Sequence, residues 1–499
     1  MTQPDQPTST GATSTTSELA VQATRGVFWV GGGQVILQII QVATMVLLAR
    51  LLIPEYFGLI GMAMVFVGIA QLIADFGLGS AIVQTKAVNP AVLSSAFWLN
   101  GTVGLALMVL AVAAAPFVAA FYENPEIEDL VMALAVTLFA SALNAVPHAI
   151  LYKAMNFAAL AKARVVSASF GSAVAIAMAA SGFGVWSLVA QPIIGAVVNL
   201  ALTWRQARWL PRLAYSFQAV KPLVGFSAAV LGNSLLHYAS RNADHLLIGR
   251  YLGSQSLGYY AMAYQLMMYP MNQVASVIIR VLFPTLSQLQ DDMDQFRRAY
   301  LKSVSVITFV TFPMMLGLFA VTPDFILVVF GEKWQPMENV LRILSIAGLI
   351  QSATTGLSTI LFAMGRTRLI IVLAVVASAL FISAIVVGLR WGIEGVAAAY
   401  TTVFLVFSEF FLAYVFRIVG IKLADFHRAL ARPAIAAAIM FASVILLEIV
   451  LRVPPIEPAV RLATCVAAGI VVYAAASFAI NRMEILSIYG LARTAMARK

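Results

Sequence analysis

Long apolar runs alternate with short polar connections along almost the whole chain. Each run is about 20 residues or longer, which is enough for a helix to cross the hydrocarbon core of a bilayer. The runs are continuous rather than alternating with polar residues, and this favours helices over the strands of a membrane barrel. Fourteen membrane helices are predicted, at residues 27–50, 56–82, 92–118, 130–151, 158–180, 184–204, 223–250, 257–286, 302–321, 339–362, 369–389, 392–416, 433–451 and 459–480. We therefore expect an all-α membrane protein without a sizeable soluble domain.

The composition leads to the same class. Of the 499 residues, 62% are hydrophobic and only 10% are charged, whereas about a quarter of the residues in a soluble domain are charged. So apolar a chain cannot cover its surface with polar groups in water. In lipid, only helices and closed barrels satisfy the hydrogen bonds of the backbone. The one cysteine, Cys465, excludes an internal disulfide.

The positions of lysine and arginine predict the orientation in the membrane. If the N-terminus is cytoplasmic, most of the 31 basic residues fall on the cytoplasmic side, as cytoplasmic loops usually require. The outer connection that contains Glu123, Glu126, Glu128 and Asp129 has no basic residue. We therefore expect both termini in the cytoplasm. Residues 1–24, rich in Ser, Thr, Gln and Pro, are predicted to be a disordered tail, and no cleaved signal peptide is expected.

The chain matches itself weakly when it is shifted by 200 residues. The pairs that become identical include Leu47 with Leu247, Arg50 with Arg250, Gly58 with Gly258 and Met62 with Met262. Because each half would hold six helices, both halves would have the same orientation, which is a repeat common in transporters with a site between the halves. A duplication without transport is the alternative. The expected organisation is a tail at 1–24, an N-lobe at 25–208, a linker at 209–222, a C-lobe at 223–418, and two further helices with the C-terminus at 419–499.

Polar residues recur at spacings of three and four within several predicted helices, so they share a helix face. Such groups are costly in a membrane and usually face a bundle interior or water. The rows are Gln34, Gln38 and Gln41 in the first helix; Gln71 and Asp75 in the second; Asn233, His237, Arg241, Asp244 and His245 in the seventh; and Gln265, Tyr269, Asn272, Ser276 and Arg280 in the eighth. A water-filled cavity lined by these helices would explain them. Hydrogen bonds or ion pairs that only join helices are the alternative.

Four segments resemble one transporter family. LLARLLIPEYFG at residues 47–58 and QLIADFGLGSA at 71–81 resemble the first helix, the turn after it and the second helix of Wzx-type polysaccharide flippases. GFGVWSLV at 182–189 and VLFPTLS at 281–287 resemble the junction before their sixth helix and the inner end of their eighth. The likeness is closest to the colanic-acid exporter branch and covers roughly residues 25 to 420. No single motif is catalytic, but their order and spacing together are specific.

The resemblance implies membership of the multidrug/oligosaccharidyl-lipid/polysaccharide exporter superfamily. Its fold has two six-helix lobes around a central cavity, with two extra C-terminal helices. The implied activity is movement of a polyprenyl-diphosphate-linked oligosaccharide between leaflets of a bacterial inner membrane, with polysaccharide polymerase and export machinery as possible partners. No cofactor or metal is expected. Coupling to H⁺ or Na⁺ is expected instead, because the sequence contains no phosphate-binding loop for ATP.

Roles for individual residues follow as hypotheses. Arginine holds phosphate oxygens in a bidentate fork, so Arg241 is the first candidate for the diphosphate and Arg280 the second. Hydrogen bonds to sugar hydroxyls are assigned to Asn233, His237, His245, Gln34, Gln38, Gln41, Tyr269 and Asn272. Asp75 and Asp244 are the candidates for ion coupling. Asp75 ranks first, since an ion pair with Arg241 would keep Asp244 ionised.

Two rival functions are open on the sequence. Asp292-Met293-Asp294 resembles the metal-binding Asp-x-Asp of glycosyltransferases, but it lies in a short connection without a nucleotide-sugar domain around it. A drug or cation exporter of the same superfamily is the closer rival. Such an exporter would favour a cavity of acidic and aromatic residues over one with arginines.

Overall fold

The computed structural model describes residues 10–74, 82, 90–213, 215–452 and 456–480, and the side chains of these residues except those of 10–30 and most of 217–240. Every regular element in these residues is a helix. Twelve helices among them are long and apolar enough to cross a membrane. The prediction of an all-α membrane protein is therefore confirmed.

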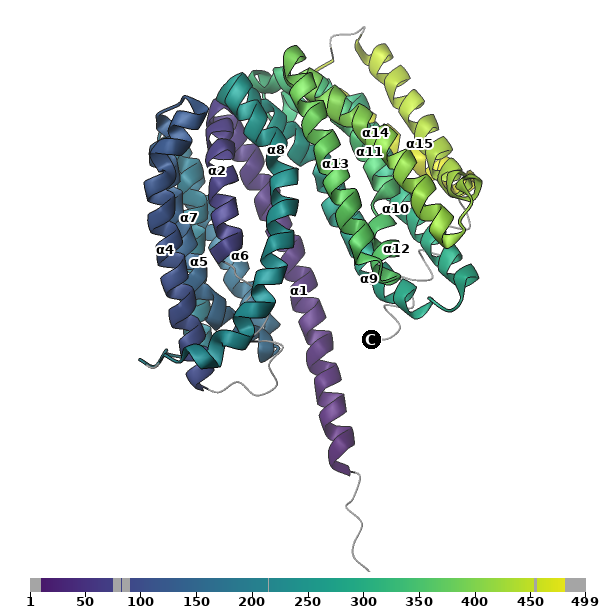
Figure 1. The fold of residues 1–499 in the computed structure, drawn as a ribbon. Coiled ribbons are helices and arrows are strands. Elements are labelled where there is room, and N and C mark those ends of the chain that lie inside the picture. Colours follow the sequence, from purple (N-terminus) through teal and green to yellow (C-terminus); the bar gives the residue numbers. More distant parts are fainter. Residues whose placement is uncertain (1–9, 75–81, 83–89, 214, 453–455, 481–499) are drawn as a thin grey trace, which may run out of the picture. The chain divides into compact units, whose positions relative to one another are not determined.

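The chain divides into two compact units. Unit 1 is Met1–Asn242 and unit 2 is Ala243–Lys499. The helices of unit 1 are α1 (Thr10–Leu51), α2 (Pro54–Ala74), α4 (Pro90–Tyr122), α5 (Glu126–Lys153), α6 (Phe157–Ala180), α7 (Trp186–Ala207) and the first part of α8 (Phe217–Pro270). Within unit 1, α4 packs against α5, α5 against α7, α7 against α6, and α6 against α1 (Figure 1).

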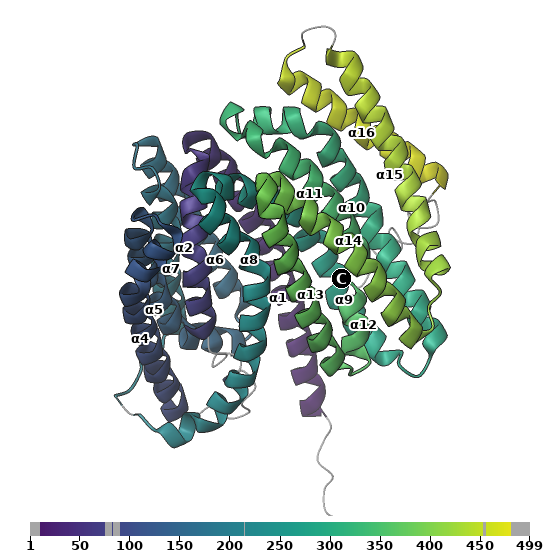
Figure 2. The same cartoon turned by 45° about the horizontal axis from the view of Figure 1, so that its top comes forward.

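Unit 2 contains the rest of α8 and all later elements. These are η1 (Met271–Ala275), α9 (Ser276–Gln288), α10 (Met293–Val329), η2 (Glu332–Met337), α11 (Glu338–Thr354), α12 (Leu357–Ala363), α13 (Thr367–Gly388), η3 (Leu389–Trp391), α14 (Gly392–Val419), α15 (Leu423–Arg452) and α16 (Pro458–Ile480). α10 packs against α11, α15 and α16, and α14 packs against α11 and α13 (Figure 2).

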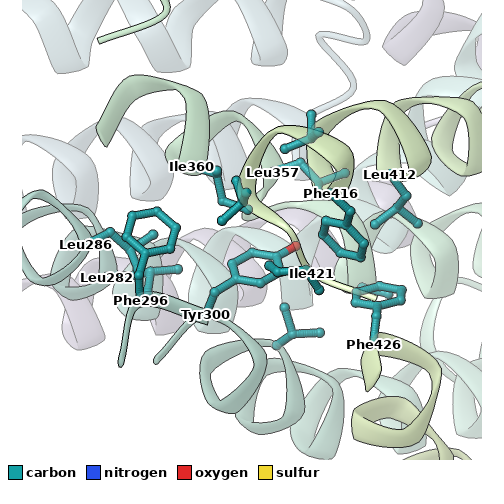
Figure 3. Close-up of a cluster of buried hydrophobic side chains, with 14 of the residues drawn as sticks. Leu282, Leu286, Phe296, Tyr300, Leu357, Ile360, Leu412, Phe416, Ile421 and Phe426 are labelled. Carbon is teal, nitrogen blue, oxygen red and sulfur yellow. The ribbon is translucent and has the colours of Figure 1, made fainter. Parts of the chain in front are cut away.

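One hydrophobic cluster joins six helices of unit 2, α9, α10, α11, α12, α14 and α15. Its buried side chains include Leu282 of α9, Tyr300 of α10, Leu357 of α12, Phe416 of α14 and Phe426 of α15 (Figure 3). In a membrane, helices associate mainly through the close packing of such side chains. This cluster therefore fixes the ends of these helices relative to one another within the unit.

Two of the twelve candidate membrane helices are more than twice the length that a single span needs. They are Arg241–Gln288, with 48 residues, and Thr367–Val419, with 53. Each contains a break: Gly253 has φ 82° and ψ 176° inside α8, and Gly392 has φ 70° between η3 and α14. Divided at these two glycines, the two long candidates become four helical segments, so the number of membrane helices among the described residues is close to the predicted fourteen.

The break in α8 also agrees with the predicted 200-residue repeat. α1 ends at Leu51 and α2 begins at Pro54, so the turn between them contains Ile53. Under the 200-residue shift Ile53 falls on Gly253, where α8 breaks. The same turn therefore recurs at equivalent positions, although the two sequences share few identities there.

Two boundaries differ from the expected organisation. α1 already begins at Thr10, inside the predicted tail, because no proline lies between Pro7 and Pro54 and helix propagation is favourable once a long helix is nucleated. The division between the units falls at Asn242, within α8, rather than at the linker 209–222. The start of α8 belongs to unit 1 because the Tyr238 hydroxyl donates a hydrogen bond to the Met64 carbonyl at 3.0 Å.

Candidate functional site

The structure places a polar row on the surface of unit 2. Gln265, Asn272 and Arg280 are exposed, and Tyr269 between them is half-buried. The row follows the end of α8, the π-helical turn η1 and the start of α9. These predicted site residues are therefore brought to one continuous stretch of helix surface.

Arg280 is held along this row by its own helix. Its Nε donates to the backbone carbonyl of Ser276 at 3.2 Å. No acidic side chain pairs with Arg280 among the residues that the structure describes. The remaining guanidinium N–H groups are exposed and can donate to two oxygens of one phosphate group.

Unit 1 carries a second polar row on α1. Gln34 and Gln41 are exposed and Gln38 is half-buried. Further along the helix, the Thr44 hydroxyl is buried and donates to the Ile40 carbonyl at 2.7 Å, so the polar face becomes covered there. The α1 row therefore ends just before the covered part of this helix face.

Asp244 lies in a buried cluster with aromatic residues of unit 2. Its side chain is 5% exposed, and its Oδ1 accepts the backbone N–H of His245 at 2.8 Å. The His245 ring lies 6.4 Å from the ring of Tyr260 and 6.3 Å from that of Tyr264. The His245 Nε2 is buried and has no hydrogen-bond partner within the described part of the chain.

Sequence reasoning missed the tyrosines of this cluster. Tyr260 and Tyr264 are four residues apart, so helical spacing could have predicted that they lie on one face of the helix. Tyr400 of α14, whose ring lies 6.3 Å from that of Tyr264, comes from a distant segment and left no such signal. The cluster therefore depends on tertiary packing.

Arg241 and Asp244 do not form the ion pair on which the expected ranking of the two acids rested. Arg241 is exposed and Asp244 is buried, and no ion pair joins them among the described residues. The boundary between the covered and uncovered faces of α8 runs between these two residues. The reason for ranking Asp75 above Asp244 is therefore absent from the described residues, and both assignments stay predictions.

Three predicted site residues cannot be placed with the others. Asp75 lies outside the described residues. Asn233 and His237 belong to α8, but their side chains are also outside the described part. Their assignment to the site stays a prediction.

The Asp-x-Asp segment has a structural role at the start of α10. Asp292 is the N-cap, and its Oδ1 accepts the Gln295 backbone N–H at 2.9 Å. Asp294 pairs with Arg297 at 3.0 Å. Throughout the described residues, no group of three or more His, Cys, Asp or Glu side chains is arranged to hold a metal ion.

Comparison with known proteins adds a family and a fold. Residues 47–339 match the family described as polysaccharide biosynthesis protein. The lipopolysaccharide biosynthesis protein WzxC of Escherichia coli K12 is 29% identical over 376 residues, covering 73% of this chain and 74% of that protein. The succinoglycan biosynthesis transport protein ExoT of Rhizobium meliloti is 31% identical over 313 residues, covering 62% and 63%.

Among solved structures, the lipid II flippase MurJ in an inward closed conformation superposes with a TM-score of 0.74. The match covers 92% of this chain and all of that one, at 16% sequence identity. At this identity the likeness establishes a shared fold.

Proposed function

Because the chain belongs to the polysaccharide biosynthesis protein family, we propose that it is a transporter that moves a lipid-linked oligosaccharide across the inner membrane of a bacterium. The cargo would be an oligosaccharide unit on a polyprenyl diphosphate, flipped from the inner to the outer leaflet for exopolysaccharide, capsule or O-antigen synthesis. The names of two relatives, a lipopolysaccharide biosynthesis protein and a succinoglycan transport protein, support this class of cargo. Both termini would lie in the cytoplasm.

The exposed polar row of unit 2 is the observation that carries this proposal. A polyprenyl-linked oligosaccharide has an anionic diphosphate, a polar glycan and an apolar tail. Arg280 suits the diphosphate, because a guanidinium binds phosphate through two parallel hydrogen bonds. Gln265, Tyr269 and Asn272 on the same surface can exchange hydrogen bonds with sugar hydroxyls.

Further contacts to the cargo would come from the remaining predicted residues. They are Gln34, Gln38 and Gln41 of α1 and Asn233, His237, Arg241 and His245 of α8. Arg241 is exposed and, like Arg280, makes no ion pair within the described residues. The polar rows would be opened to each side of the membrane in turn, as alternating access requires.

Transport would be coupled to H⁺ or Na⁺. Of the two acids predicted for this role, Asp244 now ranks above Asp75. Asp244 is buried without a cationic partner among the described residues, and an uncompensated charge is costly in such a place. Binding of a cation to its carboxylate would remove that cost, so the occupancy of Asp244 can bias the conformation of the protein.

A drug or cation exporter is the second candidate function. The observation that favours it is the buried cluster of Asp244 with Tyr260, Tyr264 and Tyr400. Acidic and aromatic groups of this kind suit a cationic ligand. The glycolipid remains the better cargo, because the chain belongs to a polysaccharide biosynthesis family and its exposed arginines suit a diphosphate.

The test is a flipping assay in proteoliposomes with a fluorescent lipid-linked oligosaccharide. In R280A, we expect the flipping rate to fall about 10- to 100-fold, since a hydrogen bond to a charged group contributes about 1.5–3 kcal/mol. R298A, which removes an exposed arginine from the start of α10, is the matched control and should flip normally. Normal flipping by R280A and R241A at normal protein levels would remove both arginines from the site. Export of a cationic dye in place of glycolipid flipping would favour the second function.

A further inference from the structure

The connection after α7 is hydrogen-bonded to α4. We call residues 208–213 with 215 and 216 the α7–α8 strap. The backbone N–H groups of Arg212 and Ser216 donate to the Ser94 and Ser95 hydroxyls, at 3.0 and 2.9 Å. The Trp98 indole N–H donates to the Arg212 carbonyl at 2.9 Å. Both serines are fully buried, so the strap is anchored at three points within unit 1.

The anchored strap presents large apolar side chains outward. Leu213 is 94% exposed, Leu210 77% and Tyr215 55%. In water, this exposure would cost free energy that the anchoring bonds do not recover. A hydrocarbon or interfacial environment around these side chains would remove the cost.

Three arginines accompany these apolar side chains. Arg205, Arg208 and Arg212 are exposed, and none of them forms an ion pair with another described residue. The sequence contains no acidic residue between Asp129 and Asp244. In unit 2, two basic residues near the starts of α10 and α15 are paired, Arg297 with Asp294 and Arg428 with Asp425.

Tryptophans mark the depth of the strap in the membrane. The Phe97 ring lies 5.4 Å from Trp98, 5.5 Å from Trp204 and 5.8 Å from Trp209. The Trp204 indole N–H donates to the carbonyl of Trp209, the second residue of the strap, at 3.0 Å. Tryptophan is enriched where a bilayer meets water. The strap therefore lies at that level of unit 1.

We propose that the α7–α8 strap is a binding surface for anionic phospholipids of the cytoplasmic leaflet. Leu210 and Leu213 enter the acyl boundary, and Arg205, Arg208 and Arg212 bind headgroup phosphates. A phospholipid has an apolar tail for the leucines and an anionic headgroup for the unpaired arginines. A soluble polyanion would contact the arginines but would leave the leucines exposed to water. The leaflet follows from the orientation given under the proposed function, but the surface itself follows from unit 1 alone.

Native mass spectrometry of the full-length protein tests the surface. The protein is mixed with phosphatidylglycerol or phosphatidylcholine in detergent, and bound lipids are counted. R205Q/R208Q/R212Q should bind phosphatidylglycerol at least tenfold more weakly, since each basic residue near an anionic surface contributes about 1 kcal/mol. R366Q/R368Q/R417Q removes three exposed arginines from unit 2 and should bind it as the wild type does. Equal losses in both variants, or no loss in the first, would overturn the proposal.

A depth measurement provides an independent result. Because Cys465 is the single cysteine, L213C in a C465S background carries one label. A bimane on Cys at position 213 should be quenched by phosphatidylglycerol brominated in its acyl chains, whereas the label in D291C, an exposed connection residue, should not. An unquenched label at 213 would show that the strap faces water. Neither measurement includes transport, so both remain informative if the proposed cargo is wrong.

Discussion

Asp324 and Arg461 illustrate how single residues join helices in unit 2. The side chain of Asp324 on α10 is 5% exposed, and its carboxylate accepts two hydrogen bonds from the guanidinium of Arg461 on α16. A second ion pair, Arg452 with Glu448, lies within α15 at 2.6 Å. The pair of Asp324 with Arg461 was not predicted, because residues 137 positions apart leave no local pattern.

Removal of Asp324 should destabilise the protein strongly. We expect D324L to lower the free energy of unfolding by about 3–5 kcal/mol, because Arg461 would then be a largely buried charge without a partner. The double variant D324L/R461L should recover much of this loss. Thermal unfolding in detergent gives the values, with R428Q as the control, for which an exposed pair predicts a loss of about 0–1 kcal/mol. Similar stabilities for D324L and R428Q would contradict the structural role.

Asp292 should stabilise the protein at neutral pH but not in acid, and it should not be needed for transport. The backbone N–H of Gln295, and then its side-chain amide, hold the pKa of Asp292 below its usual range. The lowered pKa means that the stabilisation is present above the ordinary pKa and is lost as the pH falls through the lowered one. D292N should therefore flip cargo normally. Below about pH 4, its free energy of unfolding should fall less than that of the wild type. A loss of all activity in D292N would favour the metal-binding reading of Asp292.

At the scale of single residues, the sequence predicted which side chains share a helix face better than it predicted which of them are buried. The rows from Gln265 to Arg280 and from Gln34 to Gln41 follow from helical spacing, and the structure leaves most of each row exposed. Arg241 and Asp244 also share a helix face by spacing, yet one is exposed and the other buried. Spacing does not show where a neighbouring helix stops covering that face.

Gly253 is the element-scale feature that divides α8. Its φ of 82° with ψ of 176° is a conformation that residues with a side chain avoid, although a Cβ there would meet no neighbouring atom. We expect G253A to destabilise the protein by about 1–3 kcal/mol, a cost of backbone conformation alone. Thermal unfolding measures this loss.

Gly32 offers the matched control for Gly253. A Cβ on Gly32 also meets nothing within 4 Å, but this residue lies in the regular helix α1. G32A should be neutral or stabilising by up to about 1 kcal/mol. If both substitutions behave alike, the break at Gly253 carries no conformational constraint.

Among the elements, helices with clear turn residues were predicted best. Ser181-Gly182-Phe183 separated two adjacent helices correctly, because Gly182 adopts φ 85° at the end of α6. The ends of α10 were predicted too short: it runs from Met293 to Val329, whereas hydropathy alone indicated 302–321. Asp292 caps the added first turns, which extend beyond the apolar run, so a hydropathy pattern could not reveal them.

At the scale of the whole molecule, the charge pattern predicts a definite topology. Single cysteines in a C465S background should report it: Glu126→Cys in the acidic connection should react with a membrane-impermeant maleimide added to intact cells whose outer membrane has been made permeable. Asp291→Cys should react only after the inner membrane is opened. Both residues are exposed, so access to the thiol is not limited by folding. Reaction of Asp291→Cys in intact cells would show that the orientation is the opposite of the predicted one.

The division into two units was only partly predictable. The 200-residue repeat indicated two halves and even the position of the turn at Gly253. The start of α8 was expected in the second half, yet it packs in unit 1, where Tyr238 bonds to Met64. That contact spans 174 residues of sequence, and local composition gives no sign of it.

The π-helical turn η1 has a consequence for the polar row. A π-helical turn holds about one residue more than an α-helical turn. If one residue were removed from Met271–Ala275 and the turn became α-helical, Arg280 would face nearly the same direction relative to Gln265. One residue removed from a regular stretch of helix would instead turn every later side chain by roughly 100°. The polar row can thus tolerate a change of one residue in chain length at this turn, and only there.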